Sequence, residues 1–236
     1  MSRNPRFRRR HVLTSLALVT ALGLGIAACG GDDDDSSAAS SPSSERVTQP
    51  ISESTPSAST KAADLRATLT NLLEEHVYLA GIATGTALAG NDLQPAADTL
   101  DENSVALSEA IGSVYGDQAG STFLGLWRSH IQFFVDYTNA AATGDDAGKM
   151  KARDDLDGYA HDFAAFLTGA NPKFDAATIE DALKHHAGTL FDAIDAQAAK
   201  DPSQYTKLRI AAQHMPDVAA VLADGIVQQF PEKFTD

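Results

Sequence analysis

From about residue 62 to the C-terminus, apolar residues recur at intervals of three and four, the spacing that places them on one face of an α-helix. Three such stripes run from Leu65 to Ala83, from Phe123 to Tyr137 and from Ile179 to Ile194. Strand-like alternation is absent, and runs of β-branched residues are short. The pattern therefore predicts an all-α fold.

Each apolar stripe has a histidine near its middle, and the three histidines are regularly spaced. His130 follows His76 by 54 residues, and His186 follows His130 by 56. Fourteen residues after each histidine comes a turn signal, followed by a second amphipathic segment. This regularity is typical of an αα-hairpin repeated three times. We predict one domain over residues 62–236, an up-down helical bundle of about six helices, with hairpins at about 62–116, 117–171 and 175–236.

The hairpins predict a polar layer inside the bundle, because residues equidistant from a turn lie side by side in two antiparallel helices. About fourteen residues after the turns, opposite the histidines, come Glu102-Asn103, Gly158-Tyr159 and His214-Met215. Pro216 is expected to kink its helix beside His214, since proline cannot donate to the carbonyl of Ala212. Two further histidines are weaker candidates, because His161 leaves its apolar stripe and His185 should point away from the core.

This layer is a candidate metal site. Neutral imidazole binds zinc, copper, iron and nickel, and a neighbouring thioether favours copper. We expect copper or zinc, with four histidines as ligands and four secondary candidates: His76, His130, His186 and His214, then Met215, Tyr159, Glu102 and His161. In the alternative interpretation the histidines are purely structural, since duplication copies a core histidine whether or not it has a function. The protein is then a non-enzymatic interaction or scaffolding lipoprotein with a protein partner in the cell envelope.

Motifs for several kinds of catalysis are missing from the sequence. There is no zincin motif, phosphate-binding loop, dinucleotide fingerprint or nucleophile elbow. No histidine of the domain has a glutamate three residues before it, as a ferritin-like dimetal bundle requires. An enzyme is therefore the least favoured class, and we predict no catalytic residue.

Residues 1–28 are typical of a lipoprotein signal peptide. Five arginines lie among the first ten residues, an apolar stretch from Val12 to Ala28 follows, and Ile26-Ala27-Ala28-Cys29 resembles a bacterial lipobox. Cys29 is the only cysteine, so we predict that it is lipidated and that the domain has no disulfide. The acyl chains would anchor the protein to the extracytoplasmic face of the cell membrane. Arg9-Arg10 leaves both the general and the twin-arginine export routes open.

Residues 29–61 predict a flexible tether after the lipidated cysteine. They are rich in Asp, Ser and Pro and carry almost no large apolar side chain, so they cannot offset the entropy of ordering. Without residues 1–28 the chain keeps 13 basic and 32 acidic side chains, a net charge of −19. This charge argues against nucleic acid as a partner and against electrostatic binding to anionic lipid.

Three stretches of the domain resemble an uncharacterised family of secreted helical proteins and lipoproteins of Gram-positive bacteria. They are Leu126 to Thr138, Ala212 to Met215 and Val227 to Phe234. Some relatives carry a copper amine oxidase-like label through a fused module, for which residues 30–61 leave no room. The resemblance spans Leu65 to Phe234 and implies a secreted helical protein, but no activity and no functional residue.

Overall fold

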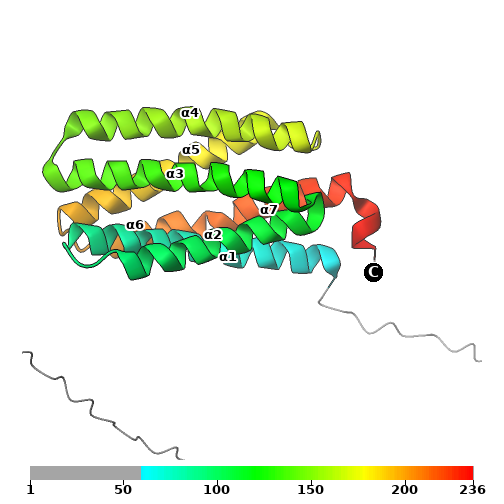
Figure 1. Ribbon diagram of the computed structural model, residues 1–236, viewed down its shortest axis with the longest axis horizontal. Helices are drawn as coiled ribbons and strands as arrows, with labels where there is room; N and C mark the ends of the chain where they lie inside the picture. Colours follow the sequence, from blue (N-terminus) through cyan, green and yellow to red (C-terminus); the bar gives the residue numbers. More distant parts are fainter. Residues whose placement is uncertain (1–59, 236) are drawn as a thin grey trace, which may run out of the picture. The chain divides into compact units, whose positions relative to one another are not determined.

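The apolar stripes form long antiparallel helices in the computed structural model, which describes residues 60–235 (Figure 1). The described part of the chain contains no strand, so the predicted all-α bundle is confirmed. The helices in chain order are α1 (Lys61–Leu88), α2 (Gln94–Tyr115), α3 (Asp117–Thr143), α4 (Asp146–Ala170), α5 (Ala176–Ala198), α6 (Gln204–Gln213), α7 (Met215–Gln229) and the 3-10 turn η1 (Pro231–Phe234).

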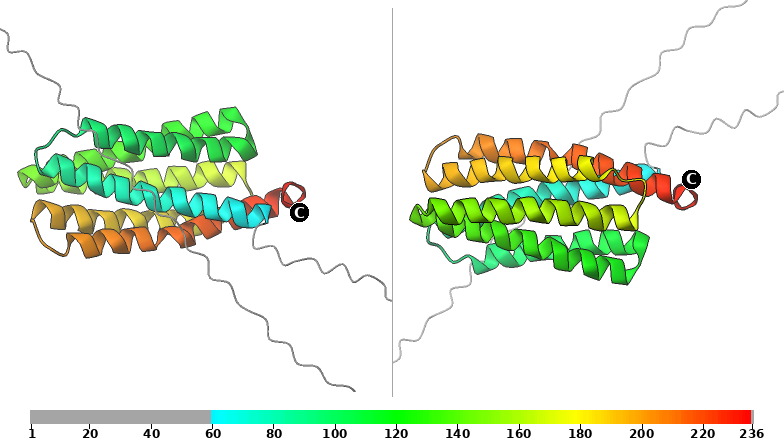
Figure 2. Two further views of the ribbon diagram at one scale, coloured as in Figure 1. Left: turned by 90° about the horizontal axis from the view of Figure 1, so that it is seen from below. Right: turned by 90° about the horizontal axis from the view of Figure 1, so that it is seen from above.

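The helices form a closed ring with three of them nearest its axis. Successive helices pack against one another, and α7 packs against α1, which closes the ring. In addition, α1, α3 and α5 all contact each other across the bundle. These are the first helices of the three hairpins, and the two views of Figure 2 show the hairpins side by side. Because the connections are short and the bundle runs up and down, α1, α3 and α5 are parallel.

The three hairpin turns share one backbone feature. Gly90, Gly144 and Lys200 all adopt positive φ, at 70°, 69° and 55°. These residues have the same spacings as the histidines, 54 and 56. The left-handed region suits glycine, which has no Cβ to clash with the carbonyl oxygen, whereas Lys200 takes the same conformation with a side chain. The shared turn geometry supports a repeat of one hairpin.

The second helix of the third hairpin is broken where the sequence predicts a kink. α6 ends at Gln213 and α7 begins at Met215, so His214 caps both helices. Pro216 lacks the N–H that would bond to the carbonyl of Ala212, which explains the position of the break. Beyond it, Met215 is buried, whereas His214 is only half-buried.

Close contacts between helices and between the chain ends fix the packing. At Gly120 of α3, a Cβ would lie 2.8 Å from the carbonyl oxygen of Ser108 in α2, so only glycine fits there.

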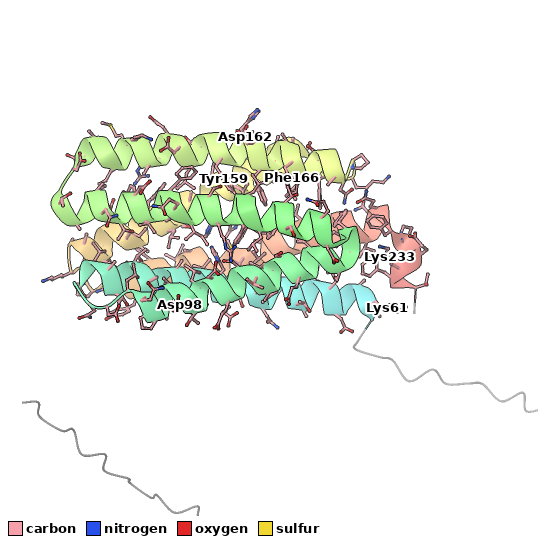
Figure 3. All side chains as sticks on the ribbon, viewed as in Figure 1. Lys61, Asp98, Tyr159, Asp162, Phe166 and Lys233 are labelled. Atoms are coloured by element: carbon pink, nitrogen blue, oxygen red, sulfur yellow. The ribbon has the colours of Figure 1, made fainter. Side chains whose placement is uncertain are left out.

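The two ends of the described chain lie at the same end of the bundle (Figures 1 and 3), where Lys61 Nζ donates to the carbonyl oxygen of Thr235 at 2.9 Å.

No helix among residues 60–235 combines the length and apolar character needed to cross a membrane. The predicted signal peptide, Cys29 and residues 29–59 of the predicted tether lie outside the described residues.

Candidate histidine site

One histidine from each of the three inner helices reaches the same level of the bundle. His76, His130 and His186 lie 12, 13 and 12 residues before the ends of α1, α3 and α5. Because these helices are parallel and in contact, such similar distances give the side chains a similar height. The ring centroid of His76 is 5.4 Å from that of His130 and 6.3 Å from that of His186. We call these three residues the histidine layer, with His76 in the middle.

The histidine layer is buried among aromatic rings. His76, His130 and His186 are 2%, 4% and 7% exposed. The ring of Trp127 lies 4.9 Å from that of His76 and 4.5 Å from that of His130. Phe134 is 6.1 Å from both His130 and His186. The rings are therefore shielded from bulk solvent in a largely aromatic environment.

Tyr159 is the aromatic neighbour that α4 contributes. Figure 3 shows Tyr159 and Phe166 on the inner side of α4 and Asp162 on its outer side. The Tyr159 ring lies 5.4 Å from the His130 ring, where the sequence places it. Burial raises the pKa of the Tyr159 hydroxyl, so it is present as a neutral phenol.

Burial also keeps the layer uncharged at neutral pH. Desolvation lowers the pKa of His76 to about 3, and repulsion from His186 contributes to this lowering. The side-chain amide of Asn103 acts in the opposite direction and raises the pKa. Desolvation, followed by repulsion from His214, lowers the pKa of His186 to about 4. Desolvation likewise moves the pKa of His130 well below its ordinary value. All three imidazoles therefore keep a free lone pair at pH 7.

The layer concentrates buried polar atoms that lack hydrogen bonds. Among residues 60–235, every buried side-chain nitrogen or oxygen without a partner belongs to the layer or to a residue beside it. Native proteins rarely leave such atoms unsatisfied, so a group of them calls for a specific explanation. The atoms are Nδ1 of His76, His130 and His186, Oδ1 of Asn103, Nε1 of Trp127, the hydroxyl oxygen of Tyr159 and Nε2 of His214.

Small cavities border the layer. A cavity of about 60 Å³ between α1, α2 and α3 is lined by His76, and one of about 50 Å³ on the other side is lined by His76, His186 and Met215. A space of about 20 Å³ lies between Trp127, His130 and His186. About 10–15 Å³ of such volume is enough for one water molecule. There is room beside the rings for an ion or for water.

His214 lies outside the histidine layer and packs against a different histidine. Its ring centroid is 4.4 Å from that of His185, which is exposed on α5. The sequence places His214 at the level of the layer by its distance from the hairpin turn, which does not give the direction of its side chain beside the predicted kink. The break before Met215 changes the direction of the side chain and brings the thioether into the cavity that His76 and His186 line.

Two secondary candidates lie away from the layer. Glu102 is exposed, and its neighbour Asn103 points inward instead, donating through Nδ2 to the Leu72 carbonyl oxygen at 3.0 Å. His161 is also exposed, with Nδ1 3.3 Å from Oε2 of Glu180. Asn103, which the sequence marked only as a neighbour, is thus the residue of α2 that faces His76.

Among residues 60–235, no group of three or more His, Cys, Asp or Glu side chains is arranged so that it could hold a metal ion. The imidazoles of the histidine layer are thus close together but do not converge on one point.

Comparison with known proteins does not assign the chain to a family. No protein-family model, no curated protein and no solved structure matches it.

Proposed function

We propose that this protein is a membrane-anchored, extracytoplasmic lipoprotein whose helical domain binds a transition-metal ion, copper or zinc, in the histidine layer. The observation that carries the metal proposal is that every unpartnered buried polar atom of residues 60–235, except Nε2 of His214, belongs to the histidine layer or to Asn103, Trp127 and Tyr159 beside it. Burial without partners is unfavourable, at about 1–3 kcal/mol per polar group, and a bound ion with its surrounding hydrogen bonds would compensate for it.

The distances between the rings support this proposal. With metal–nitrogen bonds near 2 Å, two imidazoles on one ion have ring centroids roughly 5 Å apart in tetrahedral geometry and roughly 6 Å apart in linear geometry. The His76–His130 distance of 5.4 Å suits two ligands of one tetrahedral ion, whereas His186, at 6.3 Å from His76, would have to move closer to share that ion. The rings would have to rotate for their lone pairs to meet at one ion.

The chemistry of the surroundings is consistent with this assignment. The lowered pKa of each histidine removes proton competition at pH 7, because a metal binds only the neutral imidazole. Ligating imidazoles need a partner for their second nitrogen, and the unpartnered oxygens of Asn103 and Tyr159 are beside the rings. Met215 adds a thioether, a soft ligand that favours copper over zinc.

Metal content tests the proposal. We would purify the full chain in detergent without chelators, measure bound metals by mass spectrometry, and follow the melting temperature during titration with copper and with zinc. We expect bound ion in the native chain and its loss in His130→Gln, while the exposed control His161→Ala keeps it. An ion at a hundredfold excess over its dissociation constant stabilises the fold by about 2.7 kcal/mol. A chain that carries no metal and does not gain stability would refute the proposal.

The absence of a converged ligand group in residues 60–235 favours a second candidate function, an interaction or scaffolding lipoprotein with structural histidines. In that case the layer is only a source of unsatisfied polar atoms. His130→Leu would then raise the melting temperature, because it removes one such atom from the core, and would leave the metal content unchanged. The same metal analysis distinguishes the two functions.

A further inference from the structure

A pair of histidines lies between α5 and the junction of α6 and α7, outside the histidine layer. The ring centroids of His185 and His214 are 4.4 Å apart, and the ring planes are inclined at 68°. His185 is exposed and His214 is half-buried. We call these two residues the outer histidine pair.

The pair results from two local features of the chain. His185 and His186 are consecutive on α5, and consecutive side chains of a helix point about 100° apart. His186 is buried in the layer, so His185 points outward. On the other side, the break that Pro216 explains leaves His214 at the corner between two helices, where its ring turns toward α5. The pair is therefore held by rigid elements on both sides.

The charged and polar groups around the pair leave its lone pairs available. Burial lowers the pKa of His214, and the neighbouring His185 lowers it further. Asp217, one turn later on α7, and the carbonyl of Ala182 on α5 act in the opposite direction. On α5, Lys184 is held by Glu180 at 2.6 Å. The carboxylate of Asp217 is the charged group that acts on His214, and its sign favours a cation.

One ring nitrogen of the pair is left without a partner. Nε2 of His214 is buried and accepts or donates no hydrogen bond, although His185 lies directly beside its ring. No hydrogen bond joins the two imidazoles among the bonds of the described residues. Two imidazoles that lie side by side, one of them with an unpartnered ring nitrogen, are a ligand set that one ion can bridge.

We propose that the outer histidine pair is a second metal site, which takes a divalent transition-metal ion such as Cu(II), Zn(II) or Ni(II) from solvent through two imidazoles, with water completing the coordination. Ring centroids roughly 5 Å apart are needed for two ligands on one tetrahedral ion, given metal–nitrogen bonds near 2 Å. The observed 4.4 Å requires only a small opening, which the exposed His185 side chain can make by rotation. The site does not depend on whether the buried layer binds metal.

Binding of the metal ions alone to the full chain tests this proposal. We would titrate Cu(II), Zn(II) and Ni(II) by calorimetry and record the Cu(II) electron paramagnetic resonance spectrum, in which directly bound nitrogens are visible. His185→Ala changes an exposed side chain, so the fold is retained, and it should weaken the surface site about tenfold or more. The matched control is His161→Ala, which removes an equally exposed histidine that lies beside Glu180.

The expected result is a site of two nitrogen ligands that is lost in His185→Ala and retained in His161→Ala. An unchanged affinity and an unchanged spectrum in His185→Ala would overturn the proposal. A second readout uses acylation of histidine by diethyl pyrocarbonate, followed by mass spectrometry. Metal should protect His185 and leave His161 reactive, and equal modification of His185 with and without metal would also overturn it.

A variant of the buried layer separates this inference from the proposed function. His130→Gln changes the layer on α3, away from the outer histidine pair, and should leave the surface site intact. If His185→Ala removes an ion and His130→Gln removes none, the outer pair stands and the layer proposal fails. If only His130→Gln removes an ion, the layer stands and the outer pair is refuted.

Discussion

Acid should unfold this protein through the histidine layer, and the size of the effect follows from burial. In the folded chain, desolvation holds His76, His130 and His186 neutral by lowering their pKa values. In the unfolded chain each imidazole takes up a proton at its ordinary pKa, about 6.5. The unfolded state therefore binds more protons below that pH, and the free energy of unfolding falls as the pH falls.

The magnitude is large for a domain of this size. Above about pH 7 the histidines do not change the free energy of unfolding. Below pH 6.5 each histidine lowers it by about 1.4 kcal/mol per pH unit, until the pH reaches the pKa of that histidine in the folded state. That lower limit is about 3 for His76 and about 4 for His186. At pH 5 His76 and His186 each remove about 2 kcal/mol, about 4 kcal/mol together, and His130 adds to this loss. Domains of this kind have only about 5–15 kcal/mol in total.

Urea unfolding of the metal-free full chain at a series of pH values from 7.5 to 5 measures this loss. Trp127 is the only tryptophan and contacts two of the three histidines, so its fluorescence reports on the layer. We expect the layer to bring the slope of the unfolding free energy below pH 6 close to three protons, with a further contribution from His214, whose pKa burial also lowers. Carboxyl groups with a lowered pKa, such as Asp101 in its hydrogen bond to Arg128, titrate mainly below this window.

One variant identifies the source of this pH dependence. His130→Phe should reduce the slope by about one proton, because it removes one of the three buried histidines. A free energy of unfolding that is equal at pH 7.5 and pH 5 would refute the burial argument. A slope that His130→Phe does not change would assign the protons to other residues.

Three further predictions concern stability and can be measured by thermal and urea unfolding at pH 7.5. Gly120→Ala should destabilise the protein by about 1–3 kcal/mol, because the added Cβ meets the backbone of α2. Gly125→Ala, in open space on the same helix, should stabilise it by up to about 1 kcal/mol. Equal effects of the two substitutions would contradict the close contact between α2 and α3 at Gly120. Lys200→Gly should stabilise the protein by up to about 1 kcal/mol, because glycine adopts the positive φ of this position without strain. Ala199→Gly, at the neighbouring residue with negative φ, should destabilise it. A loss of stability in both variants would exclude strain at the turn. Asn171→Ala should destabilise by about 2 kcal/mol, since it removes the hydrogen bonds from the buried amide to the Tyr115 hydroxyl and the Gly225 carbonyl oxygen, and a neutral result would mean that water replaces the amide.

The fold could be predicted because it depends on features with a period. Apolar spacing of three and four specifies a helix, and the repeated intervals between histidines and turns specify hairpins that must bury their faces against one another. The contacts among α1, α3 and α5 were not in the sequence pattern, which gives each helix an apolar face but does not say which helices lie nearest the axis.

The site could be predicted only in part, because distance from a turn gives the height of a residue and not its direction. Glu102 and Asn103 have nearly the same height but point about 100° apart, so the sequence could not choose between them, and the structure selects Asn103. Pro216 indicated a kink, but the new direction of the chain after the kink depends on packing. For that reason the contact between His214 and His185 was not foreseen.

The contact between Lys61 and Thr235 has a consequence for the order of the hairpins along the chain. Since the two ends of the described chain are in contact and α7 packs against α1, the fold does not require the chain to begin with α1. A circular permutant that joins these ends through a short linker and opens the turn at Gly144 should retain all helix contacts. The three hairpins would then be exchangeable modules, and the histidine layer would form whichever of them is synthesised first.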